Sequence, residues 1–340
     1  MRLNAAGGDG RHVAVSASDT FSIYDTGLEA VAHGDHFHYY EQTPPHLTDL
    51  SFDAPPSPGH VVAEDGRTAF FADGTGAITI IDPAALGEGE LDVVEETSAD
   101  DPHHGVAVPL SDGGLLLTQG TEESRSTVQV LDADGTLVAE TDDCPGVHGE
   151  AVAQPTESGD VISLGCENGP VVYRDGEFHK VAVDTDYQRS GNQKGSADSP
   201  IVLADNKVEA DPRGRDGAPP HVDRSHRHPG RLDDHRRPRF PPLLVPLPGP
   251  RPDGEALVLT GDGELNILDP PESGEMLHEV QVMDEWTEPE QWQTAGPMLA
   301  VADGTAFVVD PTRRSSAWST SPAARSTASW TWTSCPTRSR

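Results

Sequence analysis

Three histidines recur at a constant interval along this 340-residue chain. His60, His104 and His148 are 44 residues apart, and each opens a segment that reads as strand, turn and strand. A repeat of about 40–45 residues with four short strands per unit is typical of one blade of a β-propeller. Equivalent positions of successive blades lie side by side around the central channel, so we expect the three imidazoles to converge there. Such a convergence predicts a metal site.

The rest of the sequence favours an all-β chain. It contains 34 Gly and 30 Pro but only 5% aromatic residues, which suits many short strands and tight turns. Apolar segments separated by Asp-Gly and Asn-Gly turns recur from His12 to Asp310. We therefore predict one β-propeller of seven four-stranded blades that spans residues 1–313 and has an incomplete first blade.

The charge balance narrows the choice of partners. The net charge of −34 arises from 57 acidic against 23 basic residues, and nucleic acid demands the opposite sign. Such a surface keeps a protein soluble and concentrates cations, although adaptation to a salty environment explains it equally well. No apolar run approaches the roughly 20 residues of a membrane span, so we expect no membrane insertion. An export signal is also missing, and we expect the true start to lie upstream.

Two stretches differ from the rest of the chain in composition. Fourteen of the 23 basic residues fall within Arg213–Arg251 and Arg313–Arg340. In a GC-rich gene, a shifted reading frame turns acidic and aliphatic codons into Arg, Pro, Ser and Thr codons. We interpret residues 212–251 as an out-of-frame segment that replaces a blade, and residues 314–340 as an out-of-frame, disordered tail. The alternative is disordered basic segments or a histidine-rich metal tract.

A second histidine cluster lies in A-H-G-D-H-F-H-Y-Y and contains His33, Asp35, His36 and His38. Zinc binds four N, O or S ligands, and an aspartate can either bind the ion or orient an imidazole. We place this cluster on an exposed loop between the first two blades, where it would capture an ion quickly and hold it weakly. The alternative is a polar loop in which the histidines occur by chance.

The histidines of the repeat are the stronger candidates for tight binding, because blade strands would hold them rigidly. Glu150 or Asp35 could complete the coordination, and His103 could substitute for a neighbour. We find no G-x-S-x-G, H-E-x-x-H or phosphate-loop motif. Three histidines with an open fourth position also describe catalytic zinc, so a propeller enzyme with zinc in its channel is the alternative.

Two of the three cysteines lie within one predicted blade. Cys144 and Cys166 stand at the ends of what should be neighbouring strands, and Cys335 belongs to the aberrant tail. The placement permits a disulfide and an oxidising compartment, while two buried thiols remain the alternative.

Several motifs together resemble the AztD-type secreted zinc metallochaperones. They are H-G-D-H-F-H, S-P-G-H-V-V, P-H-H-G-V-A-V, C-P-G-V-H-G-E-A and D-E-W-T-E-P-E-Q-W. The resemblance covers residues 19–207 and 252–311. It implies a β-propeller that hands Zn²⁺ to the solute-binding protein of an ABC importer. It also implies a Cys144–Cys166 bridge and zinc on both histidine sets: His33, Asp35, His36, His38, His60, His104 and His148.

The leading hypothesis is therefore a monomeric, non-enzymatic zinc carrier in the periplasm or outside the cell. It would pass Zn²⁺ to its partner by ligand exchange. The competing hypotheses are the channel-zinc enzyme and a salt-adapted scaffold that binds no stoichiometric metal.

Overall fold

The computed structural model describes residues 2–33, 36–208, 243–246, 256–269, 275–287, 296–302, 305–310 and 328–331. Within these ranges the chain forms β-strands and a single 3-10 helix, η1 (Pro83–Glu88). The predicted all-β class is confirmed. No helix among these residues has both the length and the apolarity needed to cross a membrane.

Four consecutive sheets of the N-terminal part each contain four antiparallel strands. The first sheet contains β1 (Arg2–Ala6), β2 (His12–Ala17), β3 (Thr20–Asp25) and β6 (His46–Asp53). The second contains β7 (Pro58–Glu64), β8 (Arg67–Ala72), β9 (Ala77–Asp82) and β10 (Asp92–Ser98). The third contains β11 (Ala107–Pro109), β12 (Leu115–Gly120), β13 (Arg125–Leu131) and β14 (Leu137–Thr141). The fourth contains β15 (Glu150–Thr156), β16 (Gly159–Leu164), β17 (Val171–Arg174) and β18 (Glu177–Lys180).

The later sheets are smaller or interrupted by residues outside the described ranges. The fifth sheet pairs β19 (Gln193–Ser196) with β20 (Ser199–Ala204). The sixth contains β21 (Leu243–Pro246), β22 (Ala256–Leu259), β23 (Glu264–Asp269) and β24 (Glu275–Gln281). The seventh contains β25 (Met298–Ala302), β26 (Thr305–Val309) and β27 (Ala328–Thr331).

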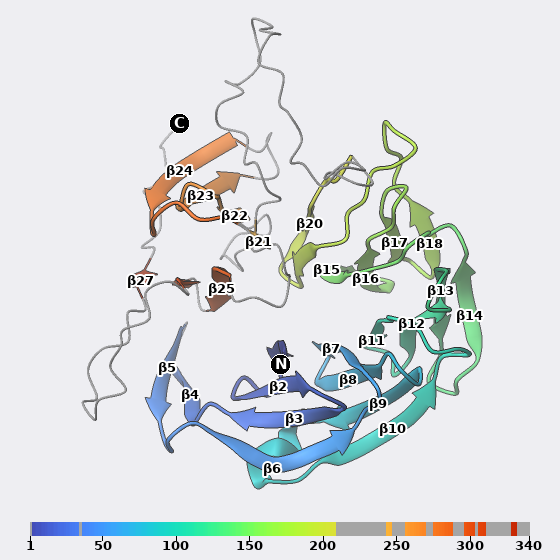
Figure 1. Cartoon of the computed structure of the whole chain (residues 1–340), viewed down its shortest axis with the longest axis horizontal. Coiled ribbons are helices and arrows are strands. Elements are labelled where there is room, and N and C mark those ends of the chain that lie inside the picture. The colour runs from blue at the N-terminus through green and yellow to red at the C-terminus, as the bar shows by residue number, and fades with distance from the viewer. Residues whose placement is uncertain are drawn as a thin grey trace, which may run out of the picture.

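The sheets follow one another around a common centre, as the blades of a propeller do (Figure 1). The first strands β7, β11 and β15 lie toward the centre, whereas the last strands β6, β10 and β14 lie at the periphery (Figure 1). Residues at or just before the starts of β7, β11 and β15 therefore lie toward the centre. This arrangement is propeller-like, and it is what positions the three histidines.

The Asp-Gly turns behave as the sequence predicts. Asp65 and Gly66, between β7 and β8, have φ values of 48° and 69°. Asp175 and Gly176, between β17 and β18, have φ values of 55° and 82°. Two central residues with positive φ are the signature of the type I′ turn, whose twist matches that of the flanking strands. These turns fix the register of the β7–β8 and β17–β18 hairpins.

Apolar clusters between neighbouring sheets form the core. Phe70 of the second sheet packs against Phe21 and Phe52 of the first, with ring centroids 5.2 and 4.8 Å apart. Val130 of the third sheet and Leu164 of the fourth belong to another cluster, and both are almost completely buried. Dispersion and the hydrophobic effect at these contacts hold each sheet in place against the next.

The histidine-rich segment differs from the prediction in both place and form. It is a two-stranded hairpin of β4 (Leu28–His33) and β5 (His36–Glu41), not a loop. Because β3 pairs with β6, the hairpin is inserted within the first sheet and not between the first two blades. Its second strand is rich in aromatic residues, which favour paired strands over a loop.

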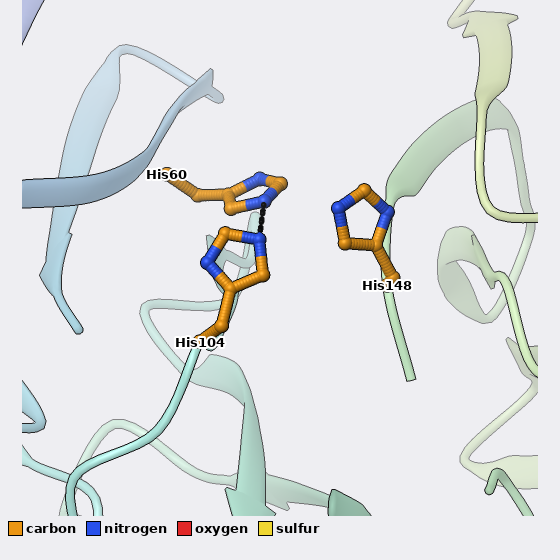
Figure 2. A group of neighbouring side chains, drawn as sticks. All are labelled: His60, His104 and His148. Atoms are coloured by element: carbon orange, nitrogen blue, oxygen red, sulfur yellow. Dashed lines mark hydrogen bonds between the residues drawn. The ribbon is translucent and has the colours of Figure 1, made fainter. Parts of the chain in front are cut away.

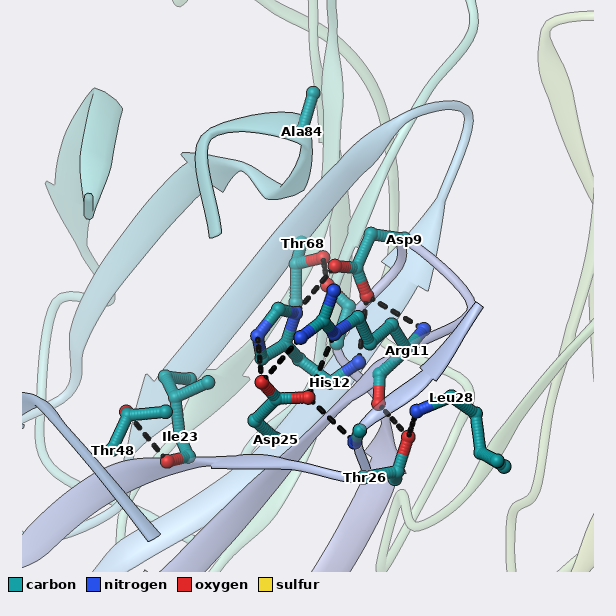
Figure 3. Close-up of polar contacts among 12 residues, drawn as sticks. Asp9, Arg11, His12, Ile23, Asp25, Thr26, Leu28, Thr48, Thr68 and Ala84 are labelled. Carbon is teal, nitrogen blue, oxygen red and sulfur yellow. Dashed lines mark hydrogen bonds and ion pairs between the residues drawn. The ribbon is translucent and has the colours of Figure 1, made fainter. Parts of the chain in front are cut away.

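A polar network holds the base of this hairpin (Figure 3). The Arg11 guanidinium donates two hydrogen bonds of 2.7 Å to the Asp25 carboxylate. Asp25 also accepts from the backbone N–H of Gly27, and the Thr26 hydroxyl donates to the Arg11 carbonyl. The Arg11 guanidinium lowers the pKa of Asp25 to about 2, although partial burial opposes the shift. The hairpin therefore leaves the first sheet from a fixed point.

The predicted domain division falls largely outside the described residues. Of the stretches 212–251 and 314–340, the structure describes β21 and β27. β21 pairs with β22, and β27 pairs with β26. The propeller over residues 1–313 and the interpretation of a shifted frame stay predictions. The first sheet contains four strands, whereas the sequence predicted an incomplete first blade.

Candidate metal centre

His60, His104 and His148 come together at the starts of three successive sheets (Figure 2). His60 lies in β7, whereas His104 and His148 lie on the segments that lead into β11 and β15. Their ring centroids are 4.9 Å (His60 to His104), 5.1 Å (His104 to His148) and 5.5 Å (His60 to His148) apart. The predicted convergence is thus present, and it follows from one position repeated on three successive sheets.

The spacing of the nitrogens matches that of a metal site. The Nε2 atoms of His60 and His104 are 3.3 Å apart. A tetrahedral Zn²⁺ with Zn–N bonds of about 2.0–2.1 Å holds its nitrogen ligands about 3.3 Å apart. One ligand atom from each of the three histidines lies within 4.8 Å of the other two.

The opposite nitrogen of each ring is in contact with an acceptor. His104 Nδ1 lies 2.6 Å from Asp73 Oδ2, and His148 Nδ1 lies 2.9 Å from the Gly191 carbonyl oxygen. His60 Nδ1 lies 3.4 Å from Glu150 Oε2. The contacts of His104 and His148 favour a proton on Nδ1, which leaves the Nε2 lone pair of each ring available for a metal. The Nε2 atoms of His60 and His104 form a hydrogen bond, which requires a proton on one of them while no metal is bound.

The surroundings of the site shift the pKa values of His148 and Glu150 in directions that favour cation binding. Burial, together with the neighbouring imidazoles of His60 and His104, lowers the pKa of His148 to about 4, against the hydrogen bond to Gly191. His148 is therefore neutral near pH 7 and can act as a ligand. Burial would raise the pKa of Glu150, but His60 and Lys194 together hold it below its ordinary value.

Other residues named from the sequence have different roles. His103 is buried, with Nδ1 2.9 Å from the Asp101 carbonyl and Nε2 3.0 Å from the Thr118 hydroxyl, so it does not join the group. Glu150 contacts His60 on Nδ1, the side away from His104 Nε2, so it is not among the clustered ligand atoms.

The hairpin histidines form a separate arrangement. His33 and His38 are exposed, and their ring centroids are 5.0 Å apart. His36 pairs with His33 across the hairpin through its backbone. Asp35 lies outside the described residues. Among the described residues, the histidines at the centre are the ones that meet as a potential metal group.

A disulfide anchors the loop that carries His148. Cys144 and Cys166 are bonded, as the resemblance implied, and both are fully buried. The His148 N–H donates to the Gly165 carbonyl (3.0 Å), next to Cys166. The cross-link therefore fixes the loop on which one of the three imidazoles is presented.

Two contributors to the site escaped the sequence analysis. Asp73 lies in F-A-D-G-T-G, which reads as an ordinary hairpin turn, and the Gly191 carbonyl carries no side-chain signal. The Asp-Gly dipeptide after a buried strand could at most have marked Asp73 as a turn residue at the end of a blade.

Comparison with known proteins confirms the resemblance. No family model matches the chain. Over 303 residues it is 27% identical to the zinc chaperone AztD of Citrobacter koseri, a match that covers 85% of this chain and 66% of that protein. The chain thus spans just under two thirds of that relative's length.

Two further matches are a solved structure and a local sequence alignment. A crystal structure of Citrobacter koseri AztD has a TM-score of 0.63 at 23% identity, covering 91% of this chain and 80% of that chain. A local match of 130 residues is 31% identical to the probable ribonuclease FAU-1 of Haloarcula marismortui. It covers 36% of this chain and 27% of that protein. The match to AztD is broad in both sequence and fold, whereas the match to the ribonuclease is local.

Proposed function

We propose that this chain is a zinc metallochaperone that binds Zn²⁺ on His60, His104 and His148. It delivers the ion to the solute-binding protein of a zinc ABC importer. The observation that carries the proposal is the 3.3 Å separation of the Nε2 atoms of His60 and His104, with His148 beside them. The similarity to a protein named as a zinc chaperone supports it and does not favour the enzymatic alternative.

The donor set suits zinc. Three neutral imidazole nitrogens are typical zinc ligands, and the ion takes four ligands in a tetrahedron. Three protein ligands leave the fourth position for water or for an incoming ligand. In a carrier, a donor from the partner enters there, and the histidines leave one after another. Transfer by ligand exchange avoids release of a free ion.

We propose a second zinc site on the β4–β5 hairpin. His33, Asp35, His36 and His38 would form an exposed site that exchanges zinc more rapidly than the centre. The exposed rings of His33 and His38 support this role, since they stand on a projecting hairpin with a fixed base. A mobile ion on such a site is accessible to a partner.

We also propose a closed arrangement of the sheets. Seven four-stranded blades would close into one ring and surround the central site. The seven successive sheets support this count. The buried Cys144–Cys166 bridge supports an oxidising compartment, in the periplasm or outside the cell. We propose that the carrier acts there as a monomer.

A metal-binding experiment tests the central claim. Purified protein is titrated with Zn²⁺ against a fluorescent chelator, and bound metal is counted by elemental analysis. The double variant His104→Ala/His148→Ala should lose tight binding, because one ligand of three remains. His179→Ala, on the exposed face of β18, is the matched control and should bind as the wild type does. Undiminished affinity of the double variant would refute the proposal.

A further inference from the structure

The outer nitrogens of two of the histidines face carboxylates from other sheets. Asp73 follows β8 of the second sheet and contacts His104, which leads into the third (2.6 Å). Glu150 begins β15 of the fourth sheet and contacts His60 of the second (3.4 Å). The imidazoles of His104 and His60 therefore each contact an acidic side chain from a different sheet.

Both carboxylates carry a buried oxygen that lacks a hydrogen bond. Among the described residues, Asp73 Oδ1 and Glu150 Oε2 are buried without a hydrogen-bond partner. The contact of Glu150 with His60, at 3.4 Å, is longer than an ordinary hydrogen bond. A buried anionic oxygen without a full partner is costly, so its retention at this place needs a compensating interaction.

The backbone beside Asp73 leaves room for its carboxylate. A methyl group on Gly59 would overlap the Asp73 carboxylate. Gly59 directly precedes His60, so the chain allows an acidic group to lie against the segment that carries a candidate ligand. A larger residue would displace Asp73 from His104.

Resting on the zinc site proposed above, we propose that Asp73 and Glu150 are positioning residues that orient His104 and His60 and offset the charge of the bound ion. Three neutral imidazoles leave both positive charges of Zn²⁺ uncompensated. A carboxylate that accepts the Nδ1 proton makes Nε2 a stronger donor and fixes the ring. The two half-buried carboxylates together supply two negative charges, equal to the charge of the ion.

Neutral isosteres test this role. Asp73→Asn, Glu150→Gln and the double variant keep side-chain volume but remove charge. Asp160→Asn is the control, since Asp160 also links neighbouring sheets through hydrogen bonds from Ser111. Each protein is titrated with Zn²⁺ against a chelator, and its Co²⁺ complex is examined by visible absorption, which reports ligand geometry.

We expect each single neutral variant to bind zinc about 10- to 100-fold more weakly, with one ion per chain and an altered Co²⁺ spectrum. The control should match the wild type. A purely structural role would lower the thermal midpoint and leave affinity and spectrum unchanged, and that result overturns the inference. If the wild type binds no zinc, the proposed function fails as well.

A second measurement needs no variant. In metal-free wild-type protein with ¹⁵N-labelled histidine, nitrogen shifts report which ring nitrogen carries the proton. We expect His104, whose Nδ1 faces Asp73, to be protonated on Nδ1 before metal is added. Protonation of His104 on Nε2 would overturn the inference, because Asp73 would then not fix the tautomer.

Discussion

The central histidines and the hairpin histidines offer the same ligand chemistry on opposite kinds of support. His60, His104 and His148 stand on successive sheets that pack through buried apolar clusters. His33 and His38 stand on a two-stranded hairpin whose first strand, β4, is exposed throughout. An isolated hairpin is at best marginally stable in water, whereas stacked sheets hold a side chain firmly. The difference suggests that one set holds an ion and the other passes it on.

The largest expected effect concerns the support itself. Phe70 is 1% exposed and contacts Phe21 and Phe52 across the first two sheets. Phe70→Ala should lower the free energy of unfolding by about 3–5 kcal/mol, because it removes buried area and leaves a cavity. Tyr40→Ala on the hairpin, where the ring is 51% exposed, should change it by less than about 0.5 kcal/mol. Urea unfolding measures both, and equal losses would remove the contrast.

The second prediction compares the ligands. His104→Ala should weaken zinc binding at the centre by about 3 kcal/mol, or about 100-fold, if a binding energy of about 10–16 kcal/mol is shared among four ligands. His38→Ala should leave this affinity within about threefold and slow transfer to an acceptor. Chelator competition gives the first quantity and stopped-flow transfer gives the second. A matching loss of affinity in His38→Ala would show that the two regions form one site.

The central site was predictable from sequence because it depends on repetition. A constant spacing of 44 residues places His60, His104 and His148 at one structural position, whatever the details of each sheet. The acceptors behind the rings were not predictable in this way. The Asp73 contact depends on how a turn of one sheet reaches the next, and the Gly191 contact uses a backbone carbonyl that any residue would provide.

The position of the histidine-rich hairpin, in contrast, was not predictable from the sequence. Its histidines were identified, but its place within the first sheet was wrong, since strand pairing between β3 and β6 spans the whole insertion. Such non-local pairing leaves little trace in a local pattern. Glu150 lay between these cases: its proximity to the site was expected, but which nitrogen of His60 it faces needed coordinates.

The third prediction tests whether the Cys144–Cys166 disulfide affects stability alone or zinc binding as well. Cys144→Ala/Cys166→Ala should lower the free energy of unfolding by about 3 kcal/mol, because a loop of 22 residues is no longer closed in the unfolded chain. Zinc affinity should fall with it, since the loop that presents His148 loses its anchor. Urea unfolding and chelator titration measure the two effects. A loss of stability with unchanged affinity would separate the bridge from the metal site.

The smallest expected effect lies at the base of the hairpin, where the two regions join. The pKa of Asp25 is lowered from its ordinary value of 3.8 to about 2 by the hydrogen bonds from Arg11. Between these values the unfolded chain binds the proton and the folded chain does not, so stability rises with pH across the window and is lost as pH falls. At neutral pH, Asp25→Asn should cost about 1–2 kcal/mol after allowance for solvent screening, and the difference should vanish near pH 2. Urea unfolding at several pH values measures it. A cost that persists at pH 2 would show that the asparagine acts through packing and not through the ion pair. In that case the hairpin would depend on the fit of its base, and its anchoring would be insensitive to pH.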